Sequence, residues 1–356
     1  MTNWFVSILD WVFSWVGNYG WAVVVFTVIV KVCLLPLDVK SRRSMRAMSA
    51  LNPQLEKLKE RYKNDQEKLN RKTQELYKKN KVNPLAGCLP MLIQLPILYI
   101  MFAAMRNVAA RMQMMQMYEW IKLNLTENQA GEALLAYDSE AVAAVLEQLR
   151  AGTMSFGDTQ PWLWVKSVFQ ADNISKAIIP TLSEFTTTYN QYINKVGLDA
   201  SVQALLKAYL DNTELANAVD GAISSYCSYR TIPIIFNIVS LKIPTNWGYV
   251  NGYYVLPILA GASQILSTKL QPTPADTPSA NNQKGGTGKF MKWFFPIFSV
   301  WICLSSTAAF AIYWVFVNVW TIATSFGINK YLEFREKKSG LIQDDDTTQK
   351  KEALQP

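Results

Sequence analysis

The chain has 356 residues, half of them hydrophobic, and a formal net charge of +8. Its mean hydropathy of +0.05 conceals nearly charge-free stretches that alternate with densely charged ones. Because the sequence contains no histidine, it excludes Ser-His-Asp catalysis and every His-containing metal site. Its four cysteines form no CxxC pair. We therefore expect an integral membrane protein that is not an enzyme and binds no metal and no cofactor.

Residues 1–16 begin the chain with tryptophans recurring on one helical face and a single charged residue, Asp10. This pattern predicts an interfacial amphipathic helix on the outer membrane surface. The segment lacks a basic n-region and a small-residue cleavage site, so we expect no signal peptide. Residues 17–38 form the first predicted span, whose apolar run contains one lysine, Lys31.

The segment 39–83 is basic, with fourteen Lys and Arg residues against five acidic ones. Asn52 followed by Pro53 predicts a helix capped by the asparagine, and Asn64 with Glu67 predicts a second capped helix. Leucines and tyrosines recur along both, which indicates an antiparallel cytosolic hairpin. It is either a solvated linker or a mobile arm that contacts acidic lipid, a ribosome or a targeting partner. The candidate contact residues of this arm are Arg42, Arg43, Arg46, Lys57, Lys59 and Arg61.

Residues 84–106 form the second predicted span. Pro90 and Pro96 lack the N–H that a helix interior needs, so we expect a kink at each. Gly87 allows close helix packing. Residues 107–252 are expected to form an extracytosolic helical insert. The ranges predicted to be helical there are 131–150 and 198–225, with an interfacial segment at 161–168.

The third predicted span is 253–270, followed by a cytosolic loop at 271–290. The apolar stretch 291–328 would be about 55 Å long as one helix, whereas the hydrocarbon core is about 30 Å thick. We therefore expect two short spans that turn near Ser305 to Thr307, followed by a cytosolic tail, 329–356. The predicted fold is an all-α, five-span helical bundle with a cytosolic helical hairpin and an extracytosolic helical insert.

The distribution of charge predicts the orientation. Lys and Arg dominate the segments 39–83 and 271–290 and the start of the tail, whereas the insert has nine basic and thirteen acidic residues. Short loops rich in Lys and Arg remain cytosolic. We expect a multi-pass protein of a bacterial cytoplasmic membrane, with its N-terminus outside and its C-terminus in the cytosol.

Lys31 allows two interpretations, because an ammonium group within the bilayer costs a few kcal/mol. The side chain could snorkel toward Asp38 and the cytosolic surface, or it could face a water-filled interior. Polar residues recur at helical spacing in the other predicted spans, which favours an interior polar groove. The groove residues we expect are Thr27, Lys31, Gln94, Gln264, Trp314 and Asn318.

The run NPLAGCLPMLIQLPIL, at 83–98, resembles the signature of YidC-type membrane protein insertases. The segments FTVIVKVCLLPLDVKSRRSM, at 26–45, and YYVLPILAGASQILSTKLQP, at 253–272, resemble that family as well. The resemblance implies a protein that takes nascent hydrophobic segments into a cationic groove, open to cytosol and lipid, and releases them into the bilayer. Lys31 then stands where the family usually has arginine, and the insert is longer than in comparable five-span members.

The partners that the resemblance implies are nascent membrane proteins and the lipid bilayer, with the ribosome, the Sec translocon and the signal recognition particle receptor as further candidates. No direct nucleic-acid readout is expected. The alternative function is a small-solute transporter, against which the lack of an internal repeat argues. An intramembrane enzyme is a third possibility, but no serine nucleophile motif or second carboxylate accompanies Lys31.

Overall fold

The computed structural model divides the chain into two compact units. Unit 1 comprises Met1–Thr27, Ile97–Ala262 and Pro296–Phe316, and unit 2 comprises Val28–Pro96, Ser263–Phe295 and Val317–Pro356. The residues that the structure describes are 2–80, 82, 89–129, 132–135, 143, 147–148, 151, 156, 158–175, 177–235, 239–270 and 286–338.

The described chain is mostly helical, as the sequence predicts. Within it, three helical stretches are long and apolar enough to cross a membrane, namely Tyr19–Ala50, Ile93–Leu123 and Ala308–Tyr331. Shorter apolar helices are Trp4–Val16, Val255–Leu270 and Trp293–Ser305. The protein is therefore built as a helical membrane protein. The number of spans depends on the shorter helices, so five remains a prediction.

Several apolar helices run past the membrane boundaries predicted from hydropathy. Helix α2 spans Tyr19–Ala50 and α5 spans Leu89–Asn124, because the polar residues beyond each apolar run are themselves good helix formers. The remaining long helices are α1 (Thr2–Val16), α10 (Val255–Leu270), α11 (Gly286–Ser305) and α12 (Ala308–Lys338). Between α11 and α12 the chain turns at Ser306 and Thr307, within the segment where the sequence suggested a turn.

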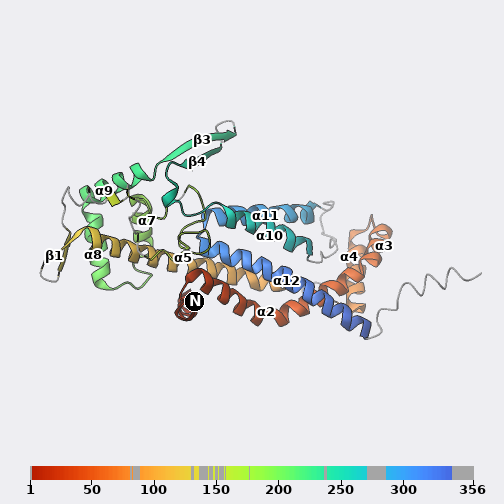
Figure 1. Cartoon of the computed structure of the whole chain (residues 1–356). Coiled ribbons are helices and arrows are strands. Elements are labelled where there is room, and N and C mark those ends of the chain that lie inside the picture. Colours follow the sequence, from red (N-terminus) through yellow and green to blue (C-terminus); the bar gives the residue numbers. More distant parts are fainter. Residues whose placement is uncertain are drawn as a thin grey trace, which may run out of the picture. The chain divides into compact units, whose positions relative to one another are not determined.

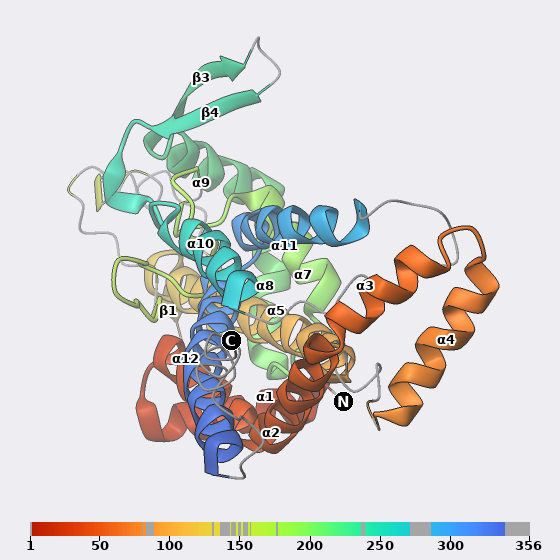
Figure 2. The same ribbon diagram turned by 90° about the vertical axis from the view of Figure 1, so that its right-hand side faces the viewer.

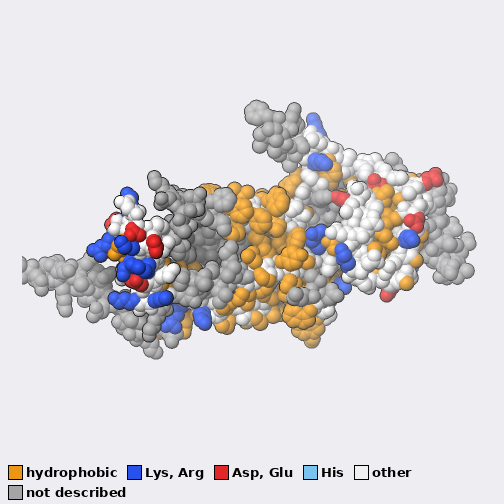
Figure 3. Space-filling model, turned by 180° about the vertical axis from the view of Figure 1, so that it is seen from behind, with side chains coloured by type: hydrophobic (Ala, Val, Ile, Leu, Met, Phe, Trp, Pro, Cys, Tyr) orange, Lys and Arg blue, Asp and Glu red, His pale blue; other side chains and the backbone are white. Residues whose placement is uncertain are grey.

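Two short basic helices, α3 (Asn52–Arg61) and α4 (Gln66–Lys79), pack against each other in unit 2 (Figures 1 and 2). Buried Met48, Leu51, Leu55 and Tyr77 form the apolar cluster beneath them. Figure 3 shows the Lys and Arg side chains that gather on this pair, with acidic side chains among them. The expected apolar stripes therefore do hold the two helices together.

Both caps predicted for this pair are wrong. Leu51 is the N-cap of α3 and makes no side-chain cap bond, because α2 runs to Ala50 and leaves no extended residue before Asn52. At the start of α4 the cap is Asp65, one residue later than expected, and its carboxylate accepts a bond from the Lys68 amide at 3.0 Å. A carboxylate suits a helix N-terminus better than a neutral amide does.

The insert is not purely helical, contrary to expectation. Strands β1 (Thr126–Gln129) and β2 (Glu132–Leu135) pair where part of the 131–150 helix was predicted. Strands β3 (Tyr229–Ile235) and β4 (Val239–Pro244) form a second antiparallel pair, followed by the 3-10 turn η2 (Trp247–Tyr249). Neither strand pair was predicted, because strands this short do not show an alternating apolar pattern long enough to identify them.

Further helices follow α5 in the part of the insert that the structure describes. These are α7 (Leu182–Tyr192), α8 (Ala200–Asp211) and α9 (Thr213–Tyr226). Asn212 divides the stretch predicted at 198–225, since it ends α8 and its side chain caps α9 at the Leu215 amide, 3.2 Å away. The start of α7, which was not predicted, has a Thr181–Glu184 capping box.

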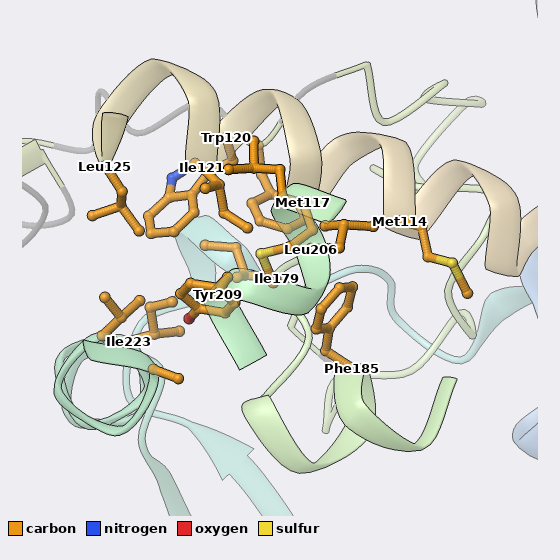
Figure 4. Packing of buried hydrophobic residues seen from close by; sticks show 14 of the residues in the cluster. Met114, Met117, Trp120, Ile121, Leu125, Ile179, Phe185, Leu206, Tyr209 and Ile223 are labelled. Atoms are coloured by element: carbon orange, nitrogen blue, oxygen red, sulfur yellow. The ribbon is translucent and has the colours of Figure 1, made fainter. Parts of the chain in front are cut away.

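One apolar core joins these helices to α5 (Figure 4). Met114, Met117 and Trp120 of α5 pack with Phe185 of α7 and Leu206 of α8, and all five are buried. The second predicted span and the insert thus share a continuous helix, and the insert core forms around the C-terminal half of that helix. Side chains that pack this way stabilise a domain by roughly 2–5 kcal/mol each when judged by truncation to alanine.

Candidate functional site

Lys31 lies on α2 in unit 2 with only 7 % of its surface exposed. Its ammonium nitrogen donates a hydrogen bond to the side-chain oxygen of Gln94 on α5, at 2.9 Å. A neutral amide satisfies one donor of the ammonium group without cancelling its charge. The structure therefore brings two of the predicted groove residues together and keeps a cation inside the helical part of the unit.

A second polar contact joins α10 to α12 in the same unit. The side-chain nitrogen of Asn318, itself buried, donates to the Ser263 hydroxyl at 3.2 Å. Gln264, the predicted groove residue beside Ser263, is half-buried and its amide reaches the Thr268 hydroxyl one turn along α10, at 3.5 Å. Asn318 thus forms a contact between helices, whereas Gln264 is engaged on its own helix.

The candidate contact residues of the basic arm, which lie on α2 and α3, divide into two groups. Arg42 donates to the Thr321 carbonyl at 3.3 Å and Arg46 donates to the Asn329 carbonyl at 3.1 Å, so both pack on α12. The remaining candidate arm residues lie toward solvent, with Lys59 half-buried and the others exposed, namely Arg43, Lys57 and Arg61. The residues available for an external contact are therefore fewer than the sequence suggested.

Two predicted groove residues belong to unit 1, and each has a partner there. The buried Thr27 hydroxyl donates to the Val23 carbonyl of its own helix at 2.7 Å. The indole nitrogen of Trp314 donates to the Ser299 hydroxyl of α11 at 3.1 Å. Neither side chain adds to the polar contacts within unit 2.

Of the predicted kink and packing residues, Pro96 lies inside α5, where it cannot donate to the preceding turn. Pro90 lies in the first described turn of that helix. Gly87 lies outside the described residues. Among the residues that the structure describes, no group of three or more Cys, Asp and Glu side chains is arranged to hold a metal ion.

Residues 160–172, which include the segment 161–168 predicted to be interfacial, receive the N-termini of three apolar helices in unit 1. At the start of α2, the Tyr19 amide donates to the Gln160 side chain at 3.1 Å. At the start of α12, the amides of Ala308 and Ala309 donate to backbone carbonyls of this segment at 2.7 and 2.9 Å. The first backbone amides of a helix have no acceptor within their own helix. The segment therefore supplies the hydrogen-bond acceptors for these amides.

The third helix, α10, is capped by Asp172. Its carboxylate accepts bonds from the amides of Leu256, at 2.6 Å, and Tyr253, at 2.7 Å, and it also accepts a bond from the Trp164 indole at 3.1 Å. Asp172 is fully buried, and negative charge at a helix N-terminus is favourable. We refer to residues 160–172 as the helix-end segment.

Asn251 fixes the shape of the helix-end segment. The buried amide accepts from the Ser167 nitrogen at 2.6 Å and donates to the carbonyls of Ser167 and Ala171, each at 2.9 Å. No local pattern signals these contacts, because the partners lie some eighty residues apart along the chain. Trp162, within the segment predicted to be interfacial, packs so tightly on Gly20 that a side chain at position 20 would strike its indole.

Helix α1, which was predicted to lie at the membrane interface, is bound within unit 1 by polar contacts. Asp10 forms an ion pair with Arg111 of α5, at 2.8 and 2.9 Å, and accepts a bond from the Tyr19 hydroxyl at 2.7 Å. A charge placed in an apolar surface helix needs such a partner. The one acidic residue of this segment was the signal that could have predicted the contact.

The family model for the 60Kd inner membrane protein matches residues 11–244 and 218–337. The chain also resembles proteins called membrane protein insertase YidC. The one from Fusobacterium nucleatum is 50% identical over 94 residues, which is 26% of this chain and 46% of that protein. The one from Anaeromyxobacter sp. is 50% identical over 100 residues, or 28% of this chain and 18% of that protein. The one from Geobacter sulfurreducens is 47% identical over 92 residues, or 26% and 17%.

The match to these relatives covers less than half of their own length. The family match, in contrast, covers most of this chain and includes all three helices long enough to cross a membrane. The resemblance read from 83–98 and its companion segments is thereby confirmed. The chain belongs to the family of 60Kd inner membrane proteins, that of YidC-type insertases, and is a bacterial inner-membrane protein.

Proposed function

We propose that this protein is a membrane protein insertase, which receives nascent hydrophobic segments in a cationic polar groove and releases them sideways into the bilayer. The observation that carries the proposal is the buried Lys31 ammonium, paired with the neutral side chain of Gln94 rather than with a carboxylate. The names of the related proteins agree with this activity.

The mechanism follows from the cost of moving polar groups into hydrocarbon. A charged or polar flank of an incoming segment costs a few kcal/mol at membrane depth. A cation that keeps its charge within the helices attracts an acidic flank electrostatically and lowers the free energy of placing it there. The apolar stretch of the same segment then leaves into lipid, where burial of its surface supplies roughly 25 cal/mol per Å².

In the proposed topology, α2, α5, α10, α11 and α12 cross the membrane, with the N-terminus outside and the C-terminus in the cytosol. Helix α10 has 16 residues, which gives it a length of about 24 Å. This is shorter than the hydrocarbon core of about 30 Å. Such a helix is accommodated by local thinning of the bilayer, which shortens the path of an incoming segment.

The basic pair α3–α4 is the proposed cytosolic contact of the insertase. Lys57 and Arg61 are exposed on α3, and Arg43 is exposed near the end of α2. Clusters of exposed Lys and Arg beside a span attract acidic lipid headgroups and other anionic surfaces. A ribosome that carries the nascent chain, the Sec translocon and the signal recognition particle receptor are the candidate protein partners.

The proposal is tested by crosslinking to a stalled single-span nascent chain. A photoreactive residue is placed at position 94, beside Lys31, and in a control protein at Tyr99, which is 73 % exposed on the same helix. We expect crosslinks to the nascent chain from position 94 that exceed those from position 99. Crosslinks from neither position, combined with solute uptake by the purified protein in vesicles, would instead favour the transporter alternative.

A further inference from the structure

The strands β3 and β4 form an isolated two-stranded ribbon in unit 1. Figures 1 and 2 both show its strands leading away from the helices of that unit. The register pairs Arg230 with Ile243, Thr231 with Lys242, and Ile232 with Leu241. A two-stranded ribbon is at best marginally stable in water by itself. The ribbon therefore needs a further contact, and the chemistry of its two faces indicates which surface can provide that contact.

The two faces differ in chemistry, because successive residues of a strand alternate between them. Ile243 and its neighbours two and four residues earlier, a leucine and a valine, take register positions of one face. Opposite them on β3 stand Arg230, Ile232 and Ile235. The other face has Lys242 opposite Thr231. Ile232 is 40 % exposed, so its apolar face is not covered there by the described chain.

Hydrogen bonds fix the base of this ribbon close to the ends of the apolar helices. The Ser175 hydroxyl donates to the Lys242 carbonyl at 3.1 Å and lies 3.2 Å from the hydroxyl of Tyr254, the residue directly before α10. Lys166, within the helix-end segment, donates to the Trp247 carbonyl at 3.2 Å.

The same helix-end segment receives the first amides of α12, one of the helices long enough to cross a membrane. The N-terminal end of such a helix marks a bilayer surface. The base of the ribbon is therefore held at the level of that surface.

The exposed groups around the ribbon's base suit a headgroup region. Trp247 and Tyr253 are 49 % and 47 % exposed, and their rings stack with centroids 6.3 Å apart. Exposed indole and phenol rings are typical of membrane interfaces. Arg230 and Lys242 are also exposed, and residues 228–244 contain no acidic side chain, although acids outnumber bases in the insert as a whole.

We propose that the β3–β4 ribbon lies in the outer membrane interface, with the Ile232 face at the boundary of the acyl chains and with Arg230, at a register position of the same face, on lipid phosphates. This inference rests on the proposed topology, in which the insert is outside. The ribbon is then a second membrane contact that braces the insert core against the bilayer.

The test uses the full chain in nanodiscs, which expose both leaflets and so make the result independent of orientation. The native cysteines are first replaced by serine; they are Cys33, Cys88, Cys227 and Cys303. A polarity-sensitive fluorophore is attached to Ile232→Cys or, as the matched control on the opposite face, to Thr231→Cys. We expect a blue-shifted emission at 232 and quenching by shallow spin-labelled lipids several-fold stronger than at 231, increasing with the fraction of anionic lipid.

Equal quenching at both positions, or none at 232, would overturn the proposal. A blue shift at 232 without lipid quenching would also overturn it, because it would show that protein covers this face. The photocrosslinking from position 94 is run on the same cysteine variants. Loss of crosslinks from position 94 with retained lipid quenching at position 232 contradicts the insertase proposal alone. Retained crosslinks without lipid quenching at position 232 contradict the ribbon proposal alone.

Discussion

The ammonium nitrogen of Lys31 lies 2.9 Å from the side-chain oxygen of Gln94, and this contact joins α2 to α5 within unit 2. The partner is an amide, so the contact orients the lysine without neutralising it. In the proposed groove, Gln94 therefore leaves the positive charge of Lys31 in place for an incoming segment.

The substitution Gln94→Glu is expected to reduce insertion. A carboxylate in hydrogen-bond reach of Lys31 would neutralise it and remove its attraction for an acidic client flank. We expect a loss of about tenfold, which corresponds to about 1.4 kcal/mol, for a client with acidic flanking residues. The measurement is protease protection of that client in proteoliposomes. Gln94→Met is the control of similar length without charge, and equal activity of the two variants would contradict the expectation.

Asn251→Ala is expected to destabilise unit 1. The substitution removes three hydrogen bonds and takes the Asn251 partner from the buried Ser167 amide and Ala171 carbonyl, whereas the Ser167 carbonyl keeps its bond from the Gln170 amide. Each such group costs about 1–3 kcal/mol, so the thermal midpoint followed by tryptophan fluorescence should fall by several degrees. Asn217→Ala, at an exposed position of α9, serves as the control. An unchanged midpoint in Asn251→Ala would show that the helix-end segment does not depend on this side chain.

Two glycine substitutions should have opposite effects. A Cβ at Gly252 would fall onto Asp172, including its backbone, so Gly252→Ala should displace the cap of α10 and lower the thermal midpoint. A Cβ at Gly221, inside α9, meets open space. Alanine there should stabilise the helix by about 0.5–1 kcal/mol, because glycine loses more backbone freedom on folding. Equal shifts of the thermal midpoint in Gly252→Ala and Gly221→Ala would contradict the close packing of Gly252 on Asp172.

Cys227 is expected to resist alkylation. Burial raises the pKa of its thiol to about 11, and only the thiolate reacts. At pH 8 its rate constant with iodoacetamide should be roughly a hundredfold below that of an ordinary thiol of pKa about 8.5, and it should increase as the pH rises toward 11. The measurement uses a variant that retains this cysteine alone. A variant with Asn217→Cys as its single cysteine, at an exposed position of α9, is the comparison, and comparable rates at pH 8 would be inconsistent with the burial of Cys227.

The helices that have a clear local pattern of apolar and polar residues were predictable from the sequence. Apolar runs and polar stripes in the local sequence were sufficient to identify α2, α5 and α12. The ends of α2 and α5 were not predicted, because hydropathy marks where lipid could end and not where helical hydrogen bonding stops. The cap of α4 was misplaced by one residue because Asn64 and Asp65 are both good caps and the choice depends on tertiary context.

The insert and its contacts were less predictable. Glu132, Ala133 and Leu134 are residues with good helix propensity, yet they pair with β1. Propensity is a weak prior that tertiary context overrides. The helix-end segment could not have been derived at all, since Asp172 and Asn251 have no local pattern and meet only after the chain has folded. Lys31 was found because a charge inside an apolar run is itself anomalous, but its partner Gln94 was one candidate among several polar residues.

The central claim, that a buried cation receives the polar flank of a client, is tested most directly by exchanging charges between Lys31 and the client. Insertion of a single-span protein is measured in proteoliposomes with either acidic or basic residues before its apolar segment. We predict that Lys31→Arg retains insertion of the acidic client, that Lys31→Glu abolishes it, and that Lys31→Glu regains activity with the basic client. Full insertion of both clients by Lys31→Ala and Lys31→Glu would contradict the account, because the charge at position 31 would then have no role.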